Sequence, residues 1–276
     1  MNINEIADKL EGTYESGNIR RTDASVIPSR DAIAEIIGDL QSLMFPGYFK
    51  GLGSFTVAEA LSILRAKLKT QIERAYHFVG ENGDKSCEVC DRFISELPKI
   101  KELLLKDIEA LYNGDPAAKC REEVLICYPG FFAISVYRIA HVLYGYRVPL
   151  ISRMMTEYAH GKTGIDIHAG ATIGEYFFID HGTGIVIGET TVIGDHVKLY
   201  QGVTLGAKSF ELDENGNPVK DIKRHPNIGN NVVIYSNATI LGGRTTVGDN
   251  CVIGGNVWLT ESVPTGMTIY YSEKHK

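Results

Sequence analysis

Hydrophobic residues in the first part of the chain recur with a helical period. Between residues 56 and 78, apolar positions lie three and four residues apart, at Ala60, Leu61, Leu64, Leu68, Ile72 and Ala75. This spacing places them on one face of an α-helix, where they pack against other helices or a core. The same pattern predicts helices over residues 31–44, 87–112 and 130–144.

Proline and glycine set the expected helix limits. Pro98 is expected to kink or split the helix over residues 87–112, and Gly114 to end it. Pro129 is expected to begin the next helix, because proline is favoured in the first turn. We therefore expect a helical amino-terminal domain over residues 1–162.

The period changes to six from Ile165 onward. Aliphatic residues six apart form several runs: Ile167, Ile173 and Ile179; Ile187, Ile193, Leu199 and Leu205; Ile228, Ile234 and Ile240; Val247, Ile253 and Leu259. A small residue, usually Gly, commonly follows each of them. A period of this kind indicates a solenoid in which short strands turn by about 120° and roughly 18 residues complete a triangular coil.

Irregularities in the repeat mark the places where loops leave the solenoid. The period slips after Ile179 and after Ile240, and residues 208–227 interrupt it. Insertions in a solenoid become surface loops, and loops commonly carry sites. We assign the β-solenoid domain to residues 163–264, with a loop at 208–227, and a carboxyl-terminal tail to residues 265–276.

Composition and charge narrow the possible partners. Of 276 residues, 44% are apolar, and the 28 Lys and Arg against 34 Asp and Glu give a net charge of −6. An acidic chain does not favour binding to nucleic acid or to an anionic membrane surface. The longest mostly apolar stretch, residues 125–137, is shorter than the roughly 20 residues of a membrane span. The amino terminus is acidic and unlike a signal peptide, which predicts a cytoplasmic protein.

The five cysteines do not form a recognisable framework. They are Cys87, Cys90, Cys120, Cys127 and Cys251. An odd and small number argues for reduced thiols. Cys87 and Cys90 form a CxxC, but no second cysteine pair or nearby histidine cluster completes a zinc site. We expect both to be structurally ordinary.

Several motifs resemble those of the serine O-acetyltransferases, a family of hexapeptide-repeat acyltransferases. The similar segments are DIHAGATIG, DHGTGIVIGET, YQGVTLG and KRHPNIGNNVVI, and the similarity extends over the solenoid to about Pro264. The Asp115–Pro116 pair, the YRIAH segment and the FPGYF at residues 45–49 also fit the family. The resemblance implies an α+β fold, with a helical amino-terminal domain followed by a left-handed parallel β-helix. It also implies acetyl transfer from acetyl-CoA to L-serine, giving O-acetyl-L-serine for cysteine biosynthesis.

Acetyl transfer to an alcohol needs a base, because a neutral hydroxyl is a poor nucleophile near pH 7. His181 lies where the period slips after Ile179, directly after Asp180. The resemblance implies that His181 is the general base and that Asp166 orients its imidazole, as aspartate does in hydrolase triads.

The amino-acid substrate offers a carboxylate and an ammonium group. Arg224 can bind the carboxylate through two hydrogen bonds. The resemblance implies that Asp115 and Asp180 bind the ammonium group and that His225 faces the substrate. Taken singly, Asp115, Arg224 and His225 are also ordinary turn and loop residues.

Small residues at solenoid corners suit the slender pantetheine arm of acetyl-CoA. By resemblance these are Gly206, Ala207, Ser236 and Gly255. Two features depart from the family. The loop over residues 208–223 is longer and poorer in Gly than usual. The basic segment that normally follows Pro264 is missing, although Lys274 and Lys276 could supply charge to the nucleotide end.

The resemblance also implies partners. It predicts trimers with active sites between neighbouring subunits, which the helical domains could pair into hexamers, and inhibition by L-cysteine at the serine site. Many members end in an isoleucine tail that enters O-acetylserine sulfhydrylase. This chain ends in Lys276, and burying its ammonium group in an apolar pocket costs free energy. We therefore expect weak or absent binding of that enzyme.

Three alternatives remain open from the sequence. One is a hexapeptide acetyltransferase acting on a sugar or antibiotic hydroxyl, although such enzymes usually lack a long helical domain. A second is a γ-type carbonic anhydrase, which needs three histidines on zinc, with His168, His181, His196 and His225 as the candidates. A third is a non-catalytic trimeric scaffold. We expect no metal.

Overall fold

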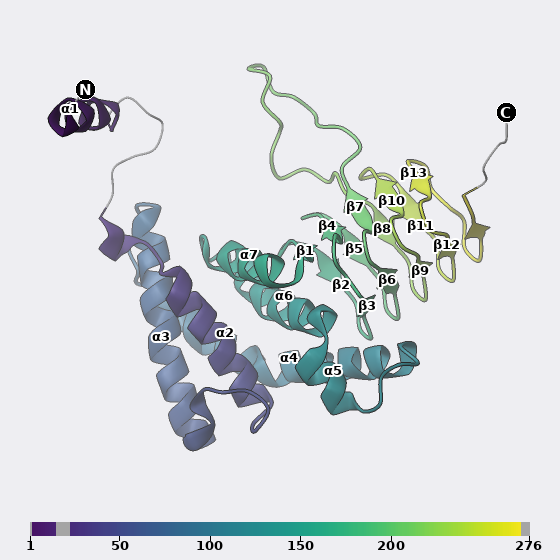
Figure 1. Ribbon diagram of the computed structural model, residues 1–276, viewed down its shortest axis with the longest axis horizontal. Coiled ribbons are helices and arrows are strands. Elements are labelled where there is room, and N and C mark those ends of the chain that lie inside the picture. The colour runs from purple at the N-terminus through teal and green to yellow at the C-terminus, as the bar shows by residue number, and fades with distance from the viewer. Residues whose placement is uncertain (1, 15–22, 272–276) are drawn as a thin grey trace.

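The computed structural model describes residues 2–14 and 23–271, in which a helical region is followed by a parallel β-solenoid (Figure 1). The helical region comprises α1 (Ile3–Thr13), η1 (Ala24–Val26), α2 (Arg30–Met44), η2 (Leu52–Ser54), α3 (Val57–Phe78), α4 (Ser86–Gly114), α5 (Arg121–Cys127), α6 (Pro129–Gly145) and α7 (Ile151–Thr163). The predicted α+β organisation is confirmed.

Local sequence explains where the long helices begin and end. Thr56 caps α3 and forms a capping box with Glu59, and Pro129 occupies the first turn of α6. The expectation that Pro98 could split its helix is wrong, because α4 runs through it to Gly114. Buried side chains continue on both sides of this proline, and their packing offsets a cost of roughly 3 kcal/mol.

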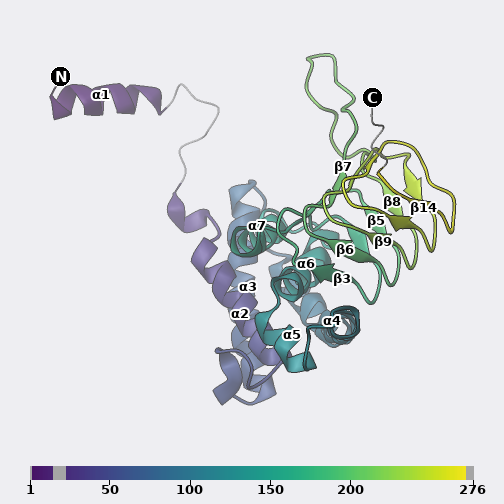
Figure 2. The ribbon, with the colours of Figure 1, turned by 45° about the vertical axis from the view of Figure 1, so that its right-hand side comes forward.

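The solenoid strands form three parallel sheets. In chain order they are β1 (Asp166–Ile167), β2 (Thr172–Ile173), β3 (Phe178–Asp180), β4 (Val186–Ile187), β5 (Val192–Ile193), β6 (Lys198–Tyr200), β7 (Thr204–Gly206), β8 (Asn227–Ile228), β9 (Val233–Ile234), β10 (Thr239–Leu241), β11 (Thr246–Val247), β12 (Val252–Ile253), β13 (Trp258–Leu259) and β14 (Thr268–Ile269). The first face is β1-β4-β7-β10-β13, the second is β2-β5-β8-β11, and the third is β3-β6-β9-β12-β14. Figure 2 shows third-face strands stacked along the solenoid.

The hexapeptide period has the predicted cause. Pairing aligns Ile167 with Ile187, and Ile187 with Leu205, on successive coils, and all three side chains are buried. The two outward turns that matter below are named here. The histidine edge is where the chain passes from the third face to the first, at His181. The arginine edge is where it passes from the first face to the second, and Arg224 packs there.

Helix α6 is attached to the first coil by side-chain hydrogen bonds to backbone carbonyls. Tyr137 donates to the Ala171 carbonyl at 2.6 Å, and Arg138 donates to those of Ile173 at 2.7 Å and Gly174 at 2.6 Å. His141 Nδ1 lies 2.7 Å from the Ala169 carbonyl. The YRIAH segment therefore joins the helical region to the solenoid.

A buried ion pair completes this junction. Asp107 of α4 and Arg138 of α6 form two hydrogen bonds, of 2.9 and 3.0 Å, and their side chains are 0% and 5% exposed. Asp107 also accepts a hydrogen bond of 3.0 Å from the Phe177 backbone N–H, just before β3. Two helices and the first coil thus meet at one charged pair.

The solenoid extends beyond residue 264. Strand β14 pairs with β12, so Thr268 and Ile269 add to the third face rather than to a separate tail. The predicted loop spans the gap between β7 and β8 and stands out from the solenoid (Figure 1). Lys274 and Lys276 lie outside the described residues.

Two sequence expectations about class can be compared with the fold. Among the described residues, no single helix is long and apolar enough to cross a membrane; α5 and α6 pass that test only as a pair, bent by 75°. All five cysteines are free, and Cys90 is buried in α4, where burial raises the pKa of its thiol to about 12. A thiol with so high a pKa is a poor redox nucleophile.

Candidate functional site

His181 projects outward from the histidine edge. Its backbone has a φ of +57° and is followed by Gly182 at +85°, so the chain turns sharply after β3. The His181 side chain is 69% exposed, and its Nε2 lies 3.7 Å from Asp180 Oδ2. No other polar contact of His181 with a described residue is present. The imidazole is therefore accessible to an incoming hydroxyl and has one carboxylate beside it.

Helix ends bring a second carboxylate to this edge. Asp115 follows the last residue of α4, and its carboxylate accepts hydrogen bonds from the Tyr128 hydroxyl at 2.5 Å and the Ala117 N–H at 2.8 Å. These two bonds, with a smaller effect from nearby His181, lower the pKa of Asp115. Asp115, Asp180 and His181 thus gather as predicted, and the two aspartates can hold an ammonium group.

The histidine edge continues as a column of equivalent positions on successive coils. Strand register aligns His181 with Gln201, Gln201 with Ser236, and Ser236 with Gly255. Neighbouring coils are about 4.8 Å apart, so Ser236 and Gly255 lie about 10 and 14 Å along the edge from His181. A Cβ on Gly255 would lie 3.2 Å from the Ser236 carbonyl, which shows that the column has little room for larger residues. A slender chain ending near His181 fits along it.

Arg224 is held at the arginine edge by an acidic neighbour. Its guanidinium forms an ion pair with Glu189, which also accepts a hydrogen bond of 2.8 Å from the Tyr144 hydroxyl. Burial acts to raise the pKa of Glu189, but the bonds from Tyr144 and Arg224 outweigh it, and the pKa is lowered. Because a guanidinium has five N–H donors, Arg224 keeps donors for a substrate carboxylate.

His225 is buried beside Arg224 and is neutral near pH 7. Burial, with the positive charge of Arg224, lowers the pKa of His225 to about 4. Its Nδ1 accepts a hydrogen bond of 3.1 Å from the Thr190 N–H, so the ring proton belongs on Nε2. A Cβ on Gly188 would lie 2.7 Å from the His225 Cγ, so only Gly leaves room for this ring. His225 can therefore act as a hydrogen-bond donor.

Two of the predicted cofactor positions also lie on the arginine edge. Pairing of β4 with β7 aligns Gly188 with Gly206 and Glu189 with Ala207. A Cβ on Gly206 would lie 2.9 Å from Leu241 Cδ2, which explains the absence of a side chain there. Small residues therefore line this edge as they line the histidine edge.

The predicted site residues fall into two half-sites on different edges of the prism. His181, Asp180, Asp115, Ser236 and Gly255 belong to the histidine edge, and Arg224, His225, Gly206 and Ala207 to the arginine edge. Residues 182–187 cross the first face between them, roughly 20 Å of extended backbone at about 3.3 Å per residue. One serine molecule cannot contact both half-sites of a single chain.

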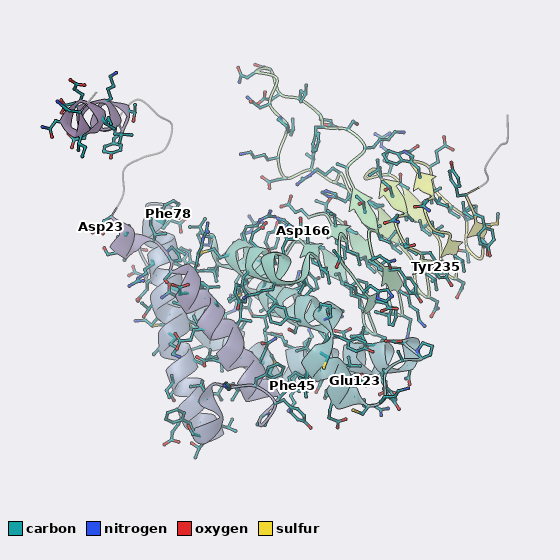
Figure 3. All side chains as sticks on the ribbon, in the orientation of Figure 1. Asp23, Phe45, Phe78, Glu123, Asp166 and Tyr235 are labelled. Atoms are coloured by element: carbon teal, nitrogen blue, oxygen red, sulfur yellow. The ribbon has the colours of Figure 1, made fainter. Side chains whose placement is uncertain are left out.

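Asp166 does not contact His181 in the single chain. It is the first residue of β1, where α7 meets the solenoid (Figure 3), and it makes no ion pair or hydrogen bond with His181. Its carboxylate lies with Glu157 and His160 of α7, with one ligand atom of each within 4.8 Å of the others. The predicted dyad contact is therefore absent, because His181 points away from the edge after β3 while Asp166 faces α7.

The four histidines considered for zinc do not converge. His168 and His225 lie near the arginine edge, His181 is on the histidine edge, and His196 stacks on Tyr176 at the remaining edge. Within residues 2–14 and 23–271, the group of three side chains placed closely enough for a metal ion is Glu157, His160 and Asp166, which includes none of these four. The zinc arrangement of a γ-type carbonic anhydrase is not formed in this chain.

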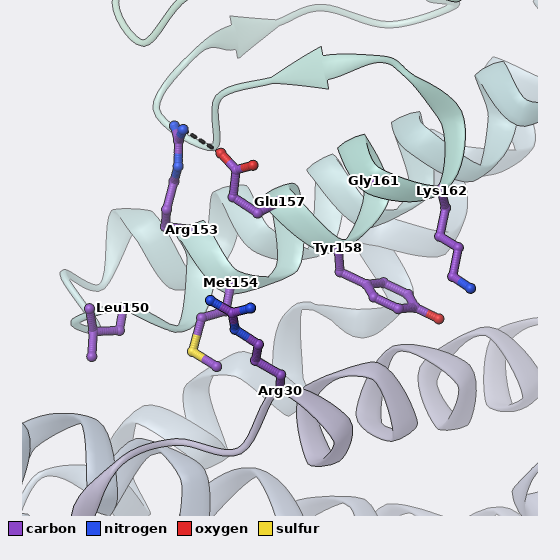
Figure 4. Close-up of a pocket in the computed structure, with 8 residues that line it drawn as sticks. All are labelled: Arg30, Leu150, Arg153, Met154, Glu157, Tyr158, Gly161 and Lys162. Carbon is purple, nitrogen blue, oxygen red and sulfur yellow. Dashed lines mark ion pairs between the residues drawn. The ribbon is translucent and has the colours of Figure 1, made fainter. Parts of the chain in front are cut away.

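Two cavities lie near these edges. One, of about 640 Å³, lies between the start of α2 and α7 (Figure 4), with Arg30 opposite Met154 and an Arg153–Glu157 ion pair at its rim. It includes none of the predicted site residues. The other, of about 850 Å³, lies beneath the loop after β7 and is lined by Glu189 and Arg224. The loop therefore covers space that belongs to the arginine half-site.

Sequence reasoning missed three residues that support the half-sites. Tyr128 binds Asp115, Glu189 binds Arg224, and Thr190 accepts hydrogen bonds from the Arg224 and His225 backbone N–H groups at 3.0 and 3.1 Å. The GET segment carrying Glu189 and Thr190 was visible as a departure from purely structural corner residues. Tyr128 carried no such signal.

Similar proteins are named after one activity. No family model matches the chain. A plasmid-encoded serine acetyltransferase of Synechococcus elongatus is 46% identical over 261 residues, covering 88% of this chain and 81% of that protein. The structure of serine acetyltransferase isoform 3 from Entamoeba histolytica in complex with cysteine is 36% identical, with a TM-score of 0.76, over 99% of this chain and 92% of that one. A serine acetyltransferase in complex with CoA is 26% identical, with a TM-score of 0.57, over 86% of this chain and 95% of that one.

Identity, coverage and fold agree with the arrangement of the two edges. The first relative matches most of both chains, and the Entamoeba structure shares both the helical region and the solenoid. The chain belongs to the serine acetyltransferase family.

Proposed function

We propose that this protein transfers the acetyl group of acetyl-CoA to the hydroxyl of L-serine, giving O-acetyl-L-serine and CoA for cysteine biosynthesis. The family supports the reaction, and a relative bound to CoA supports acetyl-CoA as the co-substrate. The observation that carries the proposal is the division of complementary groups between two edges. One edge has the base and the ammonium ligands, and the other has the carboxylate ligand.

The proposed site forms between two subunits of a trimer. The histidine edge of one prism packs against the arginine edge of the next, which brings His181 and Arg224 to the same serine. A closed ring of three heterologous contacts uses each edge once and leaves none exposed. Helical regions could then pair trimers into hexamers.

In this site, residues from both edges bind the amino acid. Arg224 binds the serine carboxylate, and Asp115 and Asp180 bind the ammonium group. Holding both ends fixes the hydroxyl beside His181, which converts a collision into a positioned attack. His225 donates a hydrogen bond from Nε2 toward the reacting groups.

His181 is the proposed general base. Its imidazole accepts the serine hydroxyl proton as the oxygen attacks the thioester carbonyl, and returns that proton to the departing CoA sulfur. Asp180, 3.7 Å from Nε2, stabilises the imidazolium that forms in between. Asp166 keeps the orienting role implied by the family, which in this chain requires His181 to adopt another rotamer. Acetyl-CoA lies along Ser236 and Gly255, with Gly206 and Ala207 of the neighbour opposite.

A release assay tests the reaction. CoA liberated from acetyl-CoA is measured with a thiol reagent in the presence of L-serine, L-threonine, or a panel of sugar and antibiotic hydroxyls. Release with serine, and O-acetyl-L-serine identified by mass spectrometry, is the expected result. Release with a sugar or antibiotic and not with serine would favour the other class of hexapeptide acetyltransferase.

L-Cysteine is proposed to inhibit at the serine site, because it keeps both charged groups and replaces the hydroxyl by a thiol. A relative is bound to cysteine. Inhibition should be competitive with serine and should weaken in parallel with serine binding in Arg224→Ala. Noncompetitive inhibition that is indifferent to Arg224 would indicate a separate regulatory site.

Weak or absent binding of O-acetylserine sulfhydrylase through the carboxyl terminus remains a proposal, as does a cytoplasmic location. A synthetic peptide of residues 267–276 titrated into that enzyme should bind weakly, whereas the Lys276→Ile peptide should bind more tightly. Submicromolar binding by the unchanged peptide would contradict the tail argument.

A further inference from the structure

Two helix ends pack closely against β3, the strand that leads into His181. A Cβ on Gly114, the last residue of α4, would lie 2.6 Å from Cδ2 of Phe178. A Cβ on Gly130, in the first turn of α6, would lie 2.5 Å from the Ile179 carbonyl oxygen. Neither glycine has a positive φ, so close packing rather than backbone conformation requires glycine here.

The residues beside these glycines face the reaction site. Asp115 directly follows Gly114, and Tyr128 lies two residues before Gly130. Asp180 and His181 directly follow the strand that both glycines contact. The close packing therefore fixes the position of Asp115 and Tyr128 relative to Asp180 and His181.

We propose that Tyr128 is a positioning residue of the serine site: its hydroxyl holds the Asp115 carboxylate beside Asp180 and His181, and Gly114 and Gly130 hold the helix ends that carry this pair. The proposal rests on the proposed function, because it assigns a task within serine binding. It concerns the amino-acid half of the reaction and leaves the acetyl-CoA column unaffected.

Contacts of Asp115 show what the tyrosine contributes. One carboxylate oxygen accepts the Tyr128 hydroxyl and the other accepts the Ala117 N–H, so rotation of the group is restricted at both oxygens. Each oxygen has a further lone pair available for an ammonium N–H. Because the carboxylate is ordered before serine binds, less conformational entropy is lost on binding.

Tyr128→Phe tests the hydroxyl alone. The KM for serine should rise about 3- to 10-fold, the cost of ordering one side chain on binding. The kcat and the KM for acetyl-CoA should stay within twofold of wild type. Because the hydroxyl lowers the pKa of Asp115, the acid limb of kcat/KM for serine should also move to higher pH. Tyr146→Phe is the control, since its ring stacks on Arg92 and its hydroxyl bonds no described residue.

Gly130→Ala tests the close packing. Displacement of the start of α6 should raise the KM for serine more than Tyr128→Phe does. Gly145→Ala is the matched control on the same helix, because its Cβ would meet nothing within 4 Å. This variant should retain wild-type kinetics.

The outcomes separate this proposal from the proposed function. A wild-type protein that does not acetylate serine would refute the function itself. If wild type is active, an unchanged serine KM and pH profile in Tyr128→Phe would overturn the role of Tyr128. An equal loss of kcat/KM for both substrates, with a lowered Tm, would also overturn it, since that pattern indicates a structural role only.

Discussion

Removal of the Asp107 carboxylate should destabilise the junction between helices and solenoid. In Asp107→Ala, the Arg138 guanidinium stays buried and keeps its bonds to the Ile173 and Gly174 carbonyls, but it loses its counter-ion. The Phe177 N–H loses its acceptor as well. Both changes leave a buried donor or charge without a partner.

The expected loss is large for one substitution. Removing one partner of a buried ion pair typically costs about 3–5 kcal/mol of unfolding free energy. At roughly 2–4 °C per kcal/mol for a chain of this size, the Tm should fall by about 6–20 °C. Urea unfolding followed by circular dichroism measures the free energy, and a thermal melt measures the Tm.

The chain offers a matched control at its surface. Arg65 and Asp91 form a similar two-bond pair, but their side chains are 38% and 60% exposed. Water can replace the lost partner there, so Asp91→Ala should leave the Tm unchanged within error. Equal effects of Asp107→Ala and Asp91→Ala would refute the argument that burial makes the first pair important.

Three further substitutions and conditions test the site. His181→Ala should lower kcat by about 10² to 10⁴ without changing the Tm, as expected for loss of a general base; wild-type turnover would remove His181 from that role. Asp180→Asn should lower kcat/KM for serine more than Asp166→Asn, because only Asp180 contacts His181; the reverse order would restore the predicted dyad. Since the pKa of His225 is about 4 when folded and about 6.5 when unfolded, stability should fall as pH drops through this window, by about 2 kcal/mol at pH 5. Urea unfolding at pH 7 and 5 checks this, and His225→Asn should lose the dependence.

The solenoid was predictable because its period has a direct physical cause. An aliphatic residue must enter the interior once per strand, so Ile187, Leu205 and their equivalents appear every sixth residue. The helices were predictable for a similar reason, except at Pro98, where packing on both sides overrides the local preference. Residues 1–13 gave no such prediction, because α1 buries none of its side chains.

The site was predictable as a set of residues but not as an arrangement. Motifs placed His181 and Arg224 in one active site, yet only the strand register shows that they lie on different edges. The contact of Asp166 could not be inferred either, because Glu157 and His160 reach it from α7, a helix distant from any motif. Tyr128 was missed because its role depends on two glycine contacts that sequence spacing does not reveal.

Complementation between inactive subunits tests the shared site most directly. Arg224→Ala and His181→Ala chains, each nearly inactive alone, are co-expressed with different affinity tags, and the purified mixture is assayed for CoA release with serine. In a cyclic trimer containing both chains, one of the three interfaces joins an intact histidine edge to an intact arginine edge. Random assembly should then restore about one quarter of wild-type activity. Activity no greater than that of the separate variants, with mixed oligomers confirmed by the two tags, would contradict a site formed between neighbouring subunits.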